Sequence, residues 1–520
     1  MSRPTSGAYP RSRLSLSAQS KHSAGSLHLE ELVFVDTFTH ELPGDPLTAP
    51  NDTKRPASAP AEKGEKSAGA ANNNPAAVVA PARSPRAVRG AFYSLVPPDT
   101  GCVHPLLIAA SPSALSMLGL AKDEYRRREF SLYMSGATHI PRARPWSAAY
   151  GGHQFGCYSG QLGDGRCVTL GEIIAAPTPQ SRRSARYEIQ LKGAGLTPYS
   201  RFGDGLTTLA AAVREFVAAE FMHSVGIPTT RALAVVATQV PVYRGADPQP
   251  HAGAVLSRAS SCWVRFGTFE LFHYRHDKER VKLLADYVIK HHFQDVLQAE
   301  EDGDASGERD TTPMEAAAAQ APTEATRSET VVVDVELNAY ARFFQEVIRR
   351  TADLVACWQA IGFVHGEMNT DNMSILGLTT DYGSYGFLDG YDPYWTPNPA
   401  DRTGRYRFER QAKIALWNLS KLGRTLAELI APPPPPAATG NQPTRSLVAA
   451  HVVRGEEIVR ELLKGFEDSF VESYSKLMCK KLGLQSVLPT DLSEIIDPLL
   501  QLLADAGADY TNFFRSLCTF

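Results

Sequence analysis

Three polar side chains near residue 370 have types and a spacing suited to chemistry. Asp371 and Asn372 are adjacent, and Asp381 follows nine residues after Asn372. Mg²⁺ prefers a few hard oxygen ligands, and the amide oxygen of Asn372 with the carboxylate of Asp381 could supply two of them. Asp371 could accept a proton from an attacking hydroxyl. The alternative is that these residues only cap turns, which is the commonest role of Asn and Asp in polar loops.

The surrounding stretch has the spacing of a known catalytic loop. The sequence HGEMNTDN, which starts at His365, fits the H-x-D-x-x-x-x-N loop of protein kinases, and Asp381-Tyr382-Gly383 fits their D-F-G element. In kinases this Asn and this Asp hold Mg²⁺ against nucleotide phosphates. Glu367 occupies the position of the kinase Asp. The motif therefore predicts a site for ATP with Mg²⁺, or Mn²⁺ in its place.

A glycine-rich stretch upstream is a second candidate for phosphate binding. The sequence GQLGDGR at 160–166 places Gly163, Gly165 and Arg166 directly before a strand expected at 168–174. Backbone amides beside glycines can approach phosphates closely. An ordinary glycine-rich hairpin turn is the alternative.

Lys192 and Glu215 could form the ion pair by which kinases position nucleotide phosphates. In the strand expected at 187–192, alternation places Lys192 on the face opposite Ile189 and Leu191. Glu215 lies on a small-residue face of a helix expected at 207–225, where a partly desolvated carboxylate needs a cationic partner. Taken separately, each residue would be read as a surface charge.

Two further segments could meet an anion: the turn at Asp204 and Gly205, and the apolar stretch that holds Arg258 and Arg265. Asp204 and Gly205 precede the helix at 207–225, where free backbone amides could bind phosphate or a plain cap could form. Arg258 and Arg265 lie in an apolar stretch, where unpaired arginines would be costly to bury. Their partner could be phosphate or an ordinary carboxylate. Seven residues apart, they share a face if helical and oppose each other if extended, and the sequence does not decide which.

The order of the expected elements indicates a bilobal α+β fold, because short strands come first and helices later. Three helices are expected in the second half, at 337–361, 410–429 and 455–482, with a turn-rich stretch at 362–392. Three segments are poor in large apolar residues and are read as low-complexity loops or linkers: 47–86, 299–329 and 432–445.

Composition limits the class of protein. The chain has 520 residues, a hydrophobic fraction of 43% and a net charge of −3, so no global field attracts nucleic acid or an acidic membrane surface. The seven cysteines are scattered without a C-x-x-C pair, which argues against a disulfide scaffold or structural zinc. No apolar run is long enough to span a membrane. Residues 1–29 are basic and Ser-rich before Glu30, which fits a mitochondrial transit peptide or a disordered tail; without import the protein would be cytoplasmic.

The motifs together resemble the selenoprotein O family of pseudokinases, which act as protein adenylyltransferases. The resemblance is carried by YGGHQFGCYSGQLGDGR (150–166), QLKGAGLTPYSRFGDG (190–205), REFVAAEFMHSVGIPTTRAL (214–233), the Arg258 and Arg265 segment, HGEMNTDNMSILGLTTDYG (365–383) and FLDGYDP (387–393).

This resemblance implies a kinase-like fold in which ATP is held flipped, so that AMP is transferred to a protein Ser, Thr or Tyr hydroxyl and pyrophosphate leaves. It implies that Asp371 is the base, that Asn372 and Asp381 bind Mg²⁺, and that Glu215 anchors Lys192. The residues implied to hold the nucleotide are Gly163, Gly165, Arg166, Lys192, Asp204, Gly205, Arg258, Arg265 and Asp381. Protein substrates and ATP are the implied partners.

The chain departs from the family pattern at two places. Family members usually carry a small apolar residue where this chain has Glu367, which could assist the base, compete for metal or raise the pKa of Asp371 by repulsion. The end, DYTNFFRSLCTF, resembles an internal family segment, so a C-terminal region is expected to be missing, and Cys518 is not equated with the terminal redox residue of relatives.

The expected organisation has two lobes. Residues 30–270 would form a strand-rich nucleotide-binding lobe, and 271–520 a helical lobe that carries the loop 365–383. The leading function is AMP transfer. A kinase-like phosphotransferase is one alternative, because the spacing of 365–383 does not distinguish attack on the α-phosphorus from attack on the γ-phosphorus. An inactive nucleotide-binding scaffold is the other, because of Glu367 and of the C-terminal region expected to be missing.

Overall fold

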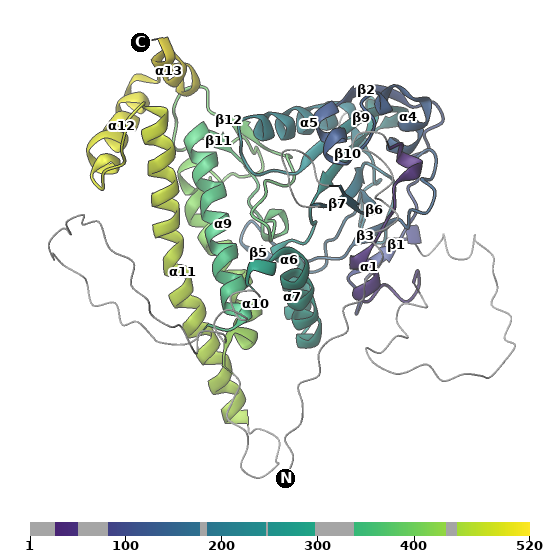
Figure 1. The fold of residues 1–520 in the computed structure, drawn as a ribbon, viewed down its shortest axis with the longest axis horizontal. Helices are drawn as coiled ribbons and strands as arrows, with labels where there is room; N and C mark the ends of the chain where they lie inside the picture. Colours follow the sequence, from purple (N-terminus) through teal and green to yellow (C-terminus); the bar gives the residue numbers. More distant parts are fainter. Residues whose placement is uncertain are drawn as a thin grey trace, which may run out of the picture. The chain divides into compact units, whose positions relative to one another are not determined.

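A computed structural model describes residues 27–49, 82–176, 185–245, 248–296, 337–432 and 445–519. Most of the expected transit peptide (1–26), the low-complexity stretches 50–81 and 433–444 and the whole of 299–329 lie outside the described residues. The chain divides into two compact units (Figure 1). Unit 1 comprises 1–149 and 161–263, and unit 2 comprises 150–160 and 264–520.

Unit 1 is built on an antiparallel sheet with the strand order β1-β3-β6-β7-β10-β9-β2, and β8 also pairs with β10. The bounds are β1 Tyr93–Leu95, β2 Leu106–Ala110, β3 Trp146–Ala148, β6 Cys167–Ala175, β7 Ala185–Lys192, β8 Thr207–Thr208, β9 Arg231–Val242 and β10 His251–Ser260. Its helices are α1 Thr37–Glu41, α3 Pro112–Met117, α4 Arg128–Met134 and α5 Leu209–Ser224. The strands expected at 168–174 and 187–192 and the helix expected at 207–225 are confirmed.

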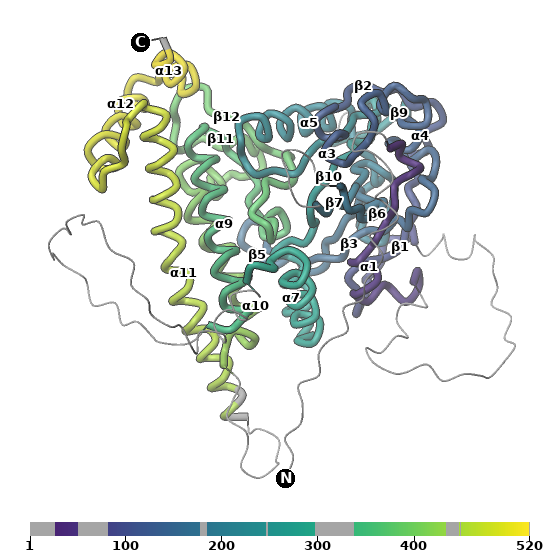
Figure 2. Tube along the Cα trace, viewed as in Figure 1, coloured from purple at the N-terminus to yellow at the C-terminus, as the bar shows by residue number. Residues whose placement is uncertain are grey.

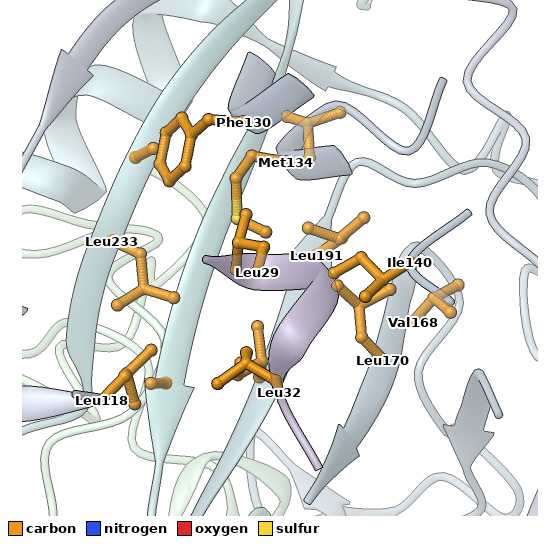
Figure 3. Packing of buried hydrophobic residues seen from close by; sticks show 14 of the residues in the cluster. Leu29, Leu32, Leu118, Phe130, Met134, Ile140, Val168, Leu170, Leu191 and Leu233 are labelled. Atoms are coloured by element: carbon orange, nitrogen blue, oxygen red, sulfur yellow. The ribbon is translucent and has the colours of Figure 1, made fainter. Parts of the chain in front are cut away.

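One face of this sheet carries the main apolar core of unit 1. Ile189 and Leu191 of β7 pack there with Phe130 and Met134 of α4. Figure 3 shows part of this cluster, to which the N-terminal segment contributes Leu29 and Leu32. Because side chains alternate along a strand, the intervening residues of β7, including Lys192, lie on the opposite face.

Helix α5 packs against β9 and β10. It buries its small residues, such as Ala212 and Ala219, together with Glu215. Its larger apolar residues Val217 and Phe221 are exposed instead. The helical spacing of apolar residues therefore predicted the helix but not its buried face, because small side chains allow a helix to approach a sheet more closely.

Unit 2 is mainly helical. Its helices are α6 Phe266–His273, α7 Lys278–His292, α9 Ala339–Ile361, α10 Gln411–Ile430, α11 Arg445–Lys481, α12 Asp497–Ala506 and α13 Tyr510–Ser516. It also contains two small ladders, β4 His153–Gln154 with β5 Cys157–Tyr158 and β11 Phe363–Val364 with β12 Gly386–Phe387. Figures 1 and 2 show the long helix α11 beside α9, and α11 also packs on α10.

The helices expected at 337–361 and 410–429 are confirmed within two residues, whereas α11 begins ten residues before its expected start at 455. The observed fold is thus a mixed one, with a large antiparallel sheet in unit 1 and many helices in unit 2. None of the helices in the described ranges is long and apolar enough to cross a membrane.

Candidate active site

The loop that carries the predicted metal ligands is held from two sides within unit 2. Met373 and Thr379 pair across the loop, which turns the chain back after the 3-10 turn Thr370–Asn372. The indole N–H of Trp358 in α9 donates to the hydroxyl of Thr379 over 2.9 Å. Ser374 pairs with Arg265, so the start of α6 supports the other side. Packing therefore orders this polar stretch, which is more than a set of turn caps.

Asp371 lies at the centre of this loop and is only 7% exposed. Its Oδ2 accepts a hydrogen bond from Nε2 of Gln154 over 3.1 Å. Its Oδ1 is buried and has no hydrogen-bond partner within the part of the chain that the structure describes. Burial raises the pKa of Asp371 to about 6, against the lowering effect of Arg265 and Gln154. A carboxylate with one oxygen held and the other unbonded is arranged to accept a proton.

Arg265 contacts the same residue through the backbone. One guanidinium N–H donates to the carbonyl of Asp371 over 2.7 Å, and the guanidinium lies 4.6 Å from the ring centroid of Tyr150. Arg265 is the N-cap residue of α6, whereas Arg258 belongs to β10. The two arginines therefore neither share a helix face nor oppose each other on one strand, because the strand ends between them.

The side chains of Asn372 and Asp381 carry oxygen ligands of the kind that a divalent cation binds. The side-chain N–H₂ of Asn372 donates to the carbonyl of Glu367 over 2.9 Å, which directs the amide oxygen elsewhere. Asp381 has a left-handed backbone (φ 66°). Burial lowers the pKa of His365, and the charge of Asp381 opposes this shift. An amide oxygen and a carboxylate suit Mg²⁺, which takes its other ligands from phosphate and water. No group of three or more His, Cys, Asp or Glu residues suited to a metal occurs within the described ranges.

Glu367 is half-buried and its Oε1 accepts a hydrogen bond from Asn369 Nδ2 over 3.3 Å. The largest contributions to the pKa of Asp371 come from burial, Arg265, Gln154 and Asp381. Repulsion from Glu367 is therefore not a leading cause of the raised pKa of Asp371.

In unit 1, Lys192 and Glu215 form a buried ion pair, with 2.5 Å between Nζ and Oε2. Arg258 donates to the other oxygen of Glu215 over 2.8 Å and to Gln190 Oε1 over 2.7 Å. The guanidinium of Arg258 also lies 4.4 Å from the ring centroid of Trp263. Glu215 thus binds two cationic side chains. Of the two partners expected for Arg258, phosphate or a carboxylate, the structure shows a carboxylate.

Gly163 and Gly165 lie in the loop before β6, where the structure gives a packing reason for both glycines. A Cβ on Gly163, whose φ is 93°, would lie 2.5 Å from the ring of Tyr199. A Cβ on Gly165 would lie 2.8 Å from the carbonyl oxygen of Tyr199. Arg166, the next residue, is exposed.

Asp204 and Gly205 do not form the start of α5. The strand β8 intervenes, and Thr208 is the N-cap residue, so both the prediction of a helix-terminal anion site here and that of a plain cap are wrong. Asp204 binds Arg244 through both carboxylate oxygens, at 2.7 and 3.0 Å. Although desolvation opposes it, the hydrogen bond from Arg244 lowers the pKa of Asp204. Gly205 packs on Gly195, and its Cβ would lie 2.2 Å from the backbone of that residue.

The sequence did not predict a site role for Thr370 within the loop, nor for three residues that join its hydrogen-bond network from outside: His153, Gln154 and Glu270. Of these residues, Glu270 could have been found from the sequence, because it is a lone carboxylate in the apolar run FGTFELF. Burying an unpaired carboxylate is as costly as burying the unpaired arginines that precede it. His153 and Gln154 give no comparable signal, because polar residues among glycines are ordinary in turns.

A buried carboxylate with an unbonded oxygen, two metal-ligand candidates and a strand lysine paired with a helix glutamate define the class: enzymes that transfer a group from a nucleoside triphosphate. Comparison with known proteins narrows this class. The family described as protein adenylyltransferase SelO matches residues 84–520. The chain therefore belongs to this family.

Relatives named protein nucleotidyltransferase YdiU support the assignment. The protein from Myxococcus xanthus is 39% identical over 432 residues, which cover 82% of this chain and 74% of the relative. That from Nitrosospira multiformis is 40% identical, with 83% and 66% covered. That from Aromatoleum aromaticum is 37% identical over 496 residues, with 94% and 76% covered.

Proposed function

We propose that the chain transfers AMP from ATP to Ser, Thr or Tyr hydroxyls of protein substrates and releases pyrophosphate. The observation that carries this proposal is the buried Oδ1 of Asp371, which has no hydrogen bond among the residues that the structure describes, in a chain of a family described as protein adenylyltransferases. The kinase-like phosphotransferase reading would use the same loop, so the transferred group has to be tested directly.

In this reaction the substrate hydroxyl oxygen bonds to the α-phosphorus of ATP and the bond to the bridging oxygen of the β-phosphate breaks. Asp371 Oδ1 accepts the hydroxyl proton, which its pKa of about 6 allows because the carboxylate predominates at pH 7. Asn372 and Asp381 would hold Mg²⁺ or Mn²⁺, which supplies neutralisation of phosphate charge when bound. Arg265 keeps the Asp371 backbone in place.

Nucleotide contacts are proposed for unit 1. The ammonium group of Lys192, oriented by Glu215, would bind phosphate oxygens, and Arg258 would add positive charge at the same carboxylate. Gly163, Gly165, Arg166 and Gly205 are assigned to the nucleotide by family resemblance. Asp204 only accepts hydrogen bonds, so its contact would be to a donor of the base or sugar rather than to phosphate.

We also propose that the chain has the bilobal kinase-like architecture, with a strand-rich nucleotide-binding lobe and a helical catalytic lobe. The division into a sheet-based unit 1 and a helical unit 2 supports this. A mitochondrial location rests on residues 1–29 alone, and the three bacterial relatives lend it no support.

The test is a comparison of ATP labelled at the α-phosphate with ATP labelled at the γ-phosphate. The proposal requires protein label from the first only, and mass spectrometry should show an AMP adduct. Label from the γ-phosphate only would establish a phosphotransferase. ATP binding without label from either would establish an inactive scaffold.

A further inference from the structure

The hairpin that contains β4 and β5 is anchored to the Asp371 loop inside unit 2. The ring Nδ1 of His153 lies 2.6 Å from Glu270 Oε1, and the hydroxyl of Thr370 donates a hydrogen bond to Glu270 Oε2. The backbone N–H of His153 donates to the hydroxyl oxygen of Thr370 over 2.7 Å. Both Glu270 and Thr370 are fully buried. The first strand of the hairpin is therefore joined to the residue that precedes Asp371 by a closed set of hydrogen bonds.

The hairpin tip is held in an unfavourable conformation by the same loop. Phe155 has a φ of 50°, which is uncommon for a bulky residue and persists only where surrounding contacts impose it. Its N–H lies 3.1 Å from Asn369 Oδ1 and 2.9 Å from the Tyr406 hydroxyl oxygen. The hydroxyl of Tyr406 in turn donates to Asn369 Oδ1 over 2.5 Å. These contacts fix Phe155, and the hydrogen bonds of His153 fix the residue on the other side of Gln154.

Two features of the hairpin act on the Asp371 carboxyl group itself. Gly152 has a φ of 151°, and a Cβ there would lie 3.0 Å from both Cβ and Oδ1 of Asp371. Gln154 Nε2 donates to Oδ2 over 3.1 Å. The glycine permits the close approach, and the amide then selects which carboxylate oxygen is held. Oδ1 remains as the oxygen without a partner in the described residues.

We propose that Gln154 is a positioning residue for the transfer reaction: it holds Oδ2 of Asp371 and so leaves Oδ1 as the oxygen that accepts the proton of the substrate hydroxyl. This inference rests on the proposed function, in which Asp371 is the base. A side chain so placed should act on the rate of the chemical step and not on ATP binding, because within the described residues its amide donates to the Asp371 carboxylate. Gln154 is fixed by its neighbours His153 and Phe155, so its amide reaches Oδ2 without ordering a flexible loop.

Gln154→Met separates an effect on the chemical step from an effect on ATP binding, because it keeps the length of the side chain and removes the N–H donor. Ser159→Ala on the same hairpin is the matched control, because Ser159 is exposed and its hydroxyl contacts the carbonyl of Cys157. We expect Gln154→Met to lower kcat for label transfer from α-labelled ATP by roughly 10- to 100-fold. KM for ATP should stay within about twofold, and the control should leave both unchanged.

A double-mutant cycle with Asp371→Ala, read on the urea unfolding midpoint of the full chain, tests the contact without relying on activity. The effect of Gln154→Met should shrink in the Asp371→Ala background, because the hydrogen-bond acceptor is gone. An unchanged kcat in Gln154→Met, or a raised KM for ATP with normal kcat, would overturn the inference while leaving AMP transfer intact. If the unmodified chain transfers no AMP, the proposed function fails. In that case the unfolding experiment still tests the contact: additive effects of Gln154→Met and Asp371→Ala on the urea midpoint would overturn it.

Discussion

The ammonium group of Lys192 in β7 and the carboxylate of Glu215 in α5 are both buried and lie 2.5 Å apart, and Arg258 binds the second oxygen of the same carboxylate. Removing one partner of a buried ion pair leaves an uncompensated charge. Replacing each of the three residues should therefore cost a different amount of stability, because Lys192 and Arg258 share one anion, Glu215.

Glu215→Leu should therefore destabilise the protein more than Lys192→Met. The first change leaves two buried cations without their carboxylate and should cost about 3–5 kcal/mol. The second leaves Glu215 with Arg258 and should cost less. Urea unfolding midpoints of the two variants measure this difference, and equal losses would contradict the shared-anion arrangement. Lys192→Met should in addition weaken ATP binding, measured by calorimetry on the folded variant.

Asp371→Ala and Asp381→Ala should differ in what they lose. If Asp371 is the base, its removal should lower the AMP-transfer rate by roughly 10²- to 10⁴-fold with little loss of ATP affinity. If Asp381 is a metal ligand, its removal should also raise the Mg²⁺ concentration needed for half-maximal transfer. Normal transfer by Asp371→Ala would refute its assignment as the base.

Glu367→Ala should retain AMP transfer within a few-fold, even though Glu367 aligns with the kinase Asp. The reason is that Asn372 is held by the backbone carbonyl of residue 367 and not by its carboxylate. Asn372→Ala, the paired variant, should raise the Mg²⁺ concentration needed for half-maximal transfer because it removes the amide oxygen. A loss of transfer in Glu367→Ala comparable to that of Asp371→Ala would show that the extra carboxylate takes part in the chemistry.

Lys481 should make stability depend on pH in the alkaline range. Burial lowers its pKa from 10.5 to about 8, where it contacts Tyr510 and Phe514. Between pH 8 and 10.5 the unfolded chain binds the proton that the folded chain has lost, so this residue's contribution to stability rises with pH. The melting temperature of Lys481→Met minus that of the unmodified chain should therefore be higher at pH 7 than at pH 9.5. A difference independent of pH would contradict the lowered pKa.

Local patterns were enough to predict much of the site. Alternation in β7 assigns Lys192 to its face, and helical spacing assigns Glu215 to a small-residue face of α5, so the sequence alone allows their pairing to be proposed. The spacing of Asp371, Asn372 and Asp381 likewise depends on a short loop. Residues close in sequence, or within one regular element, have relative positions that backbone geometry constrains.

Tertiary packing decided the rest. Gln154 reaches Asp371 from a segment more than two hundred residues away, and no local pattern encodes that approach. Helix α5 buries the face that carries its alanines, because small side chains allow close packing on the sheet. Phe221, on another face of the helix, is left exposed. Arg258 met a carboxylate because β10 lies beside β7 and below α5.

The amino-acid sequence by itself thus determined which groups could do chemistry, since residue type and short-range spacing specify the donors, acceptors and charges. The tertiary structure alone decided which carboxylate oxygen of Asp371 accepts a hydrogen bond and which has none in the described ranges of the chain. That selection depends on hydrogen bonds from Gln154 and on the absence of a Cβ at Gly152, and such contacts between distant segments exist only after the chain has folded.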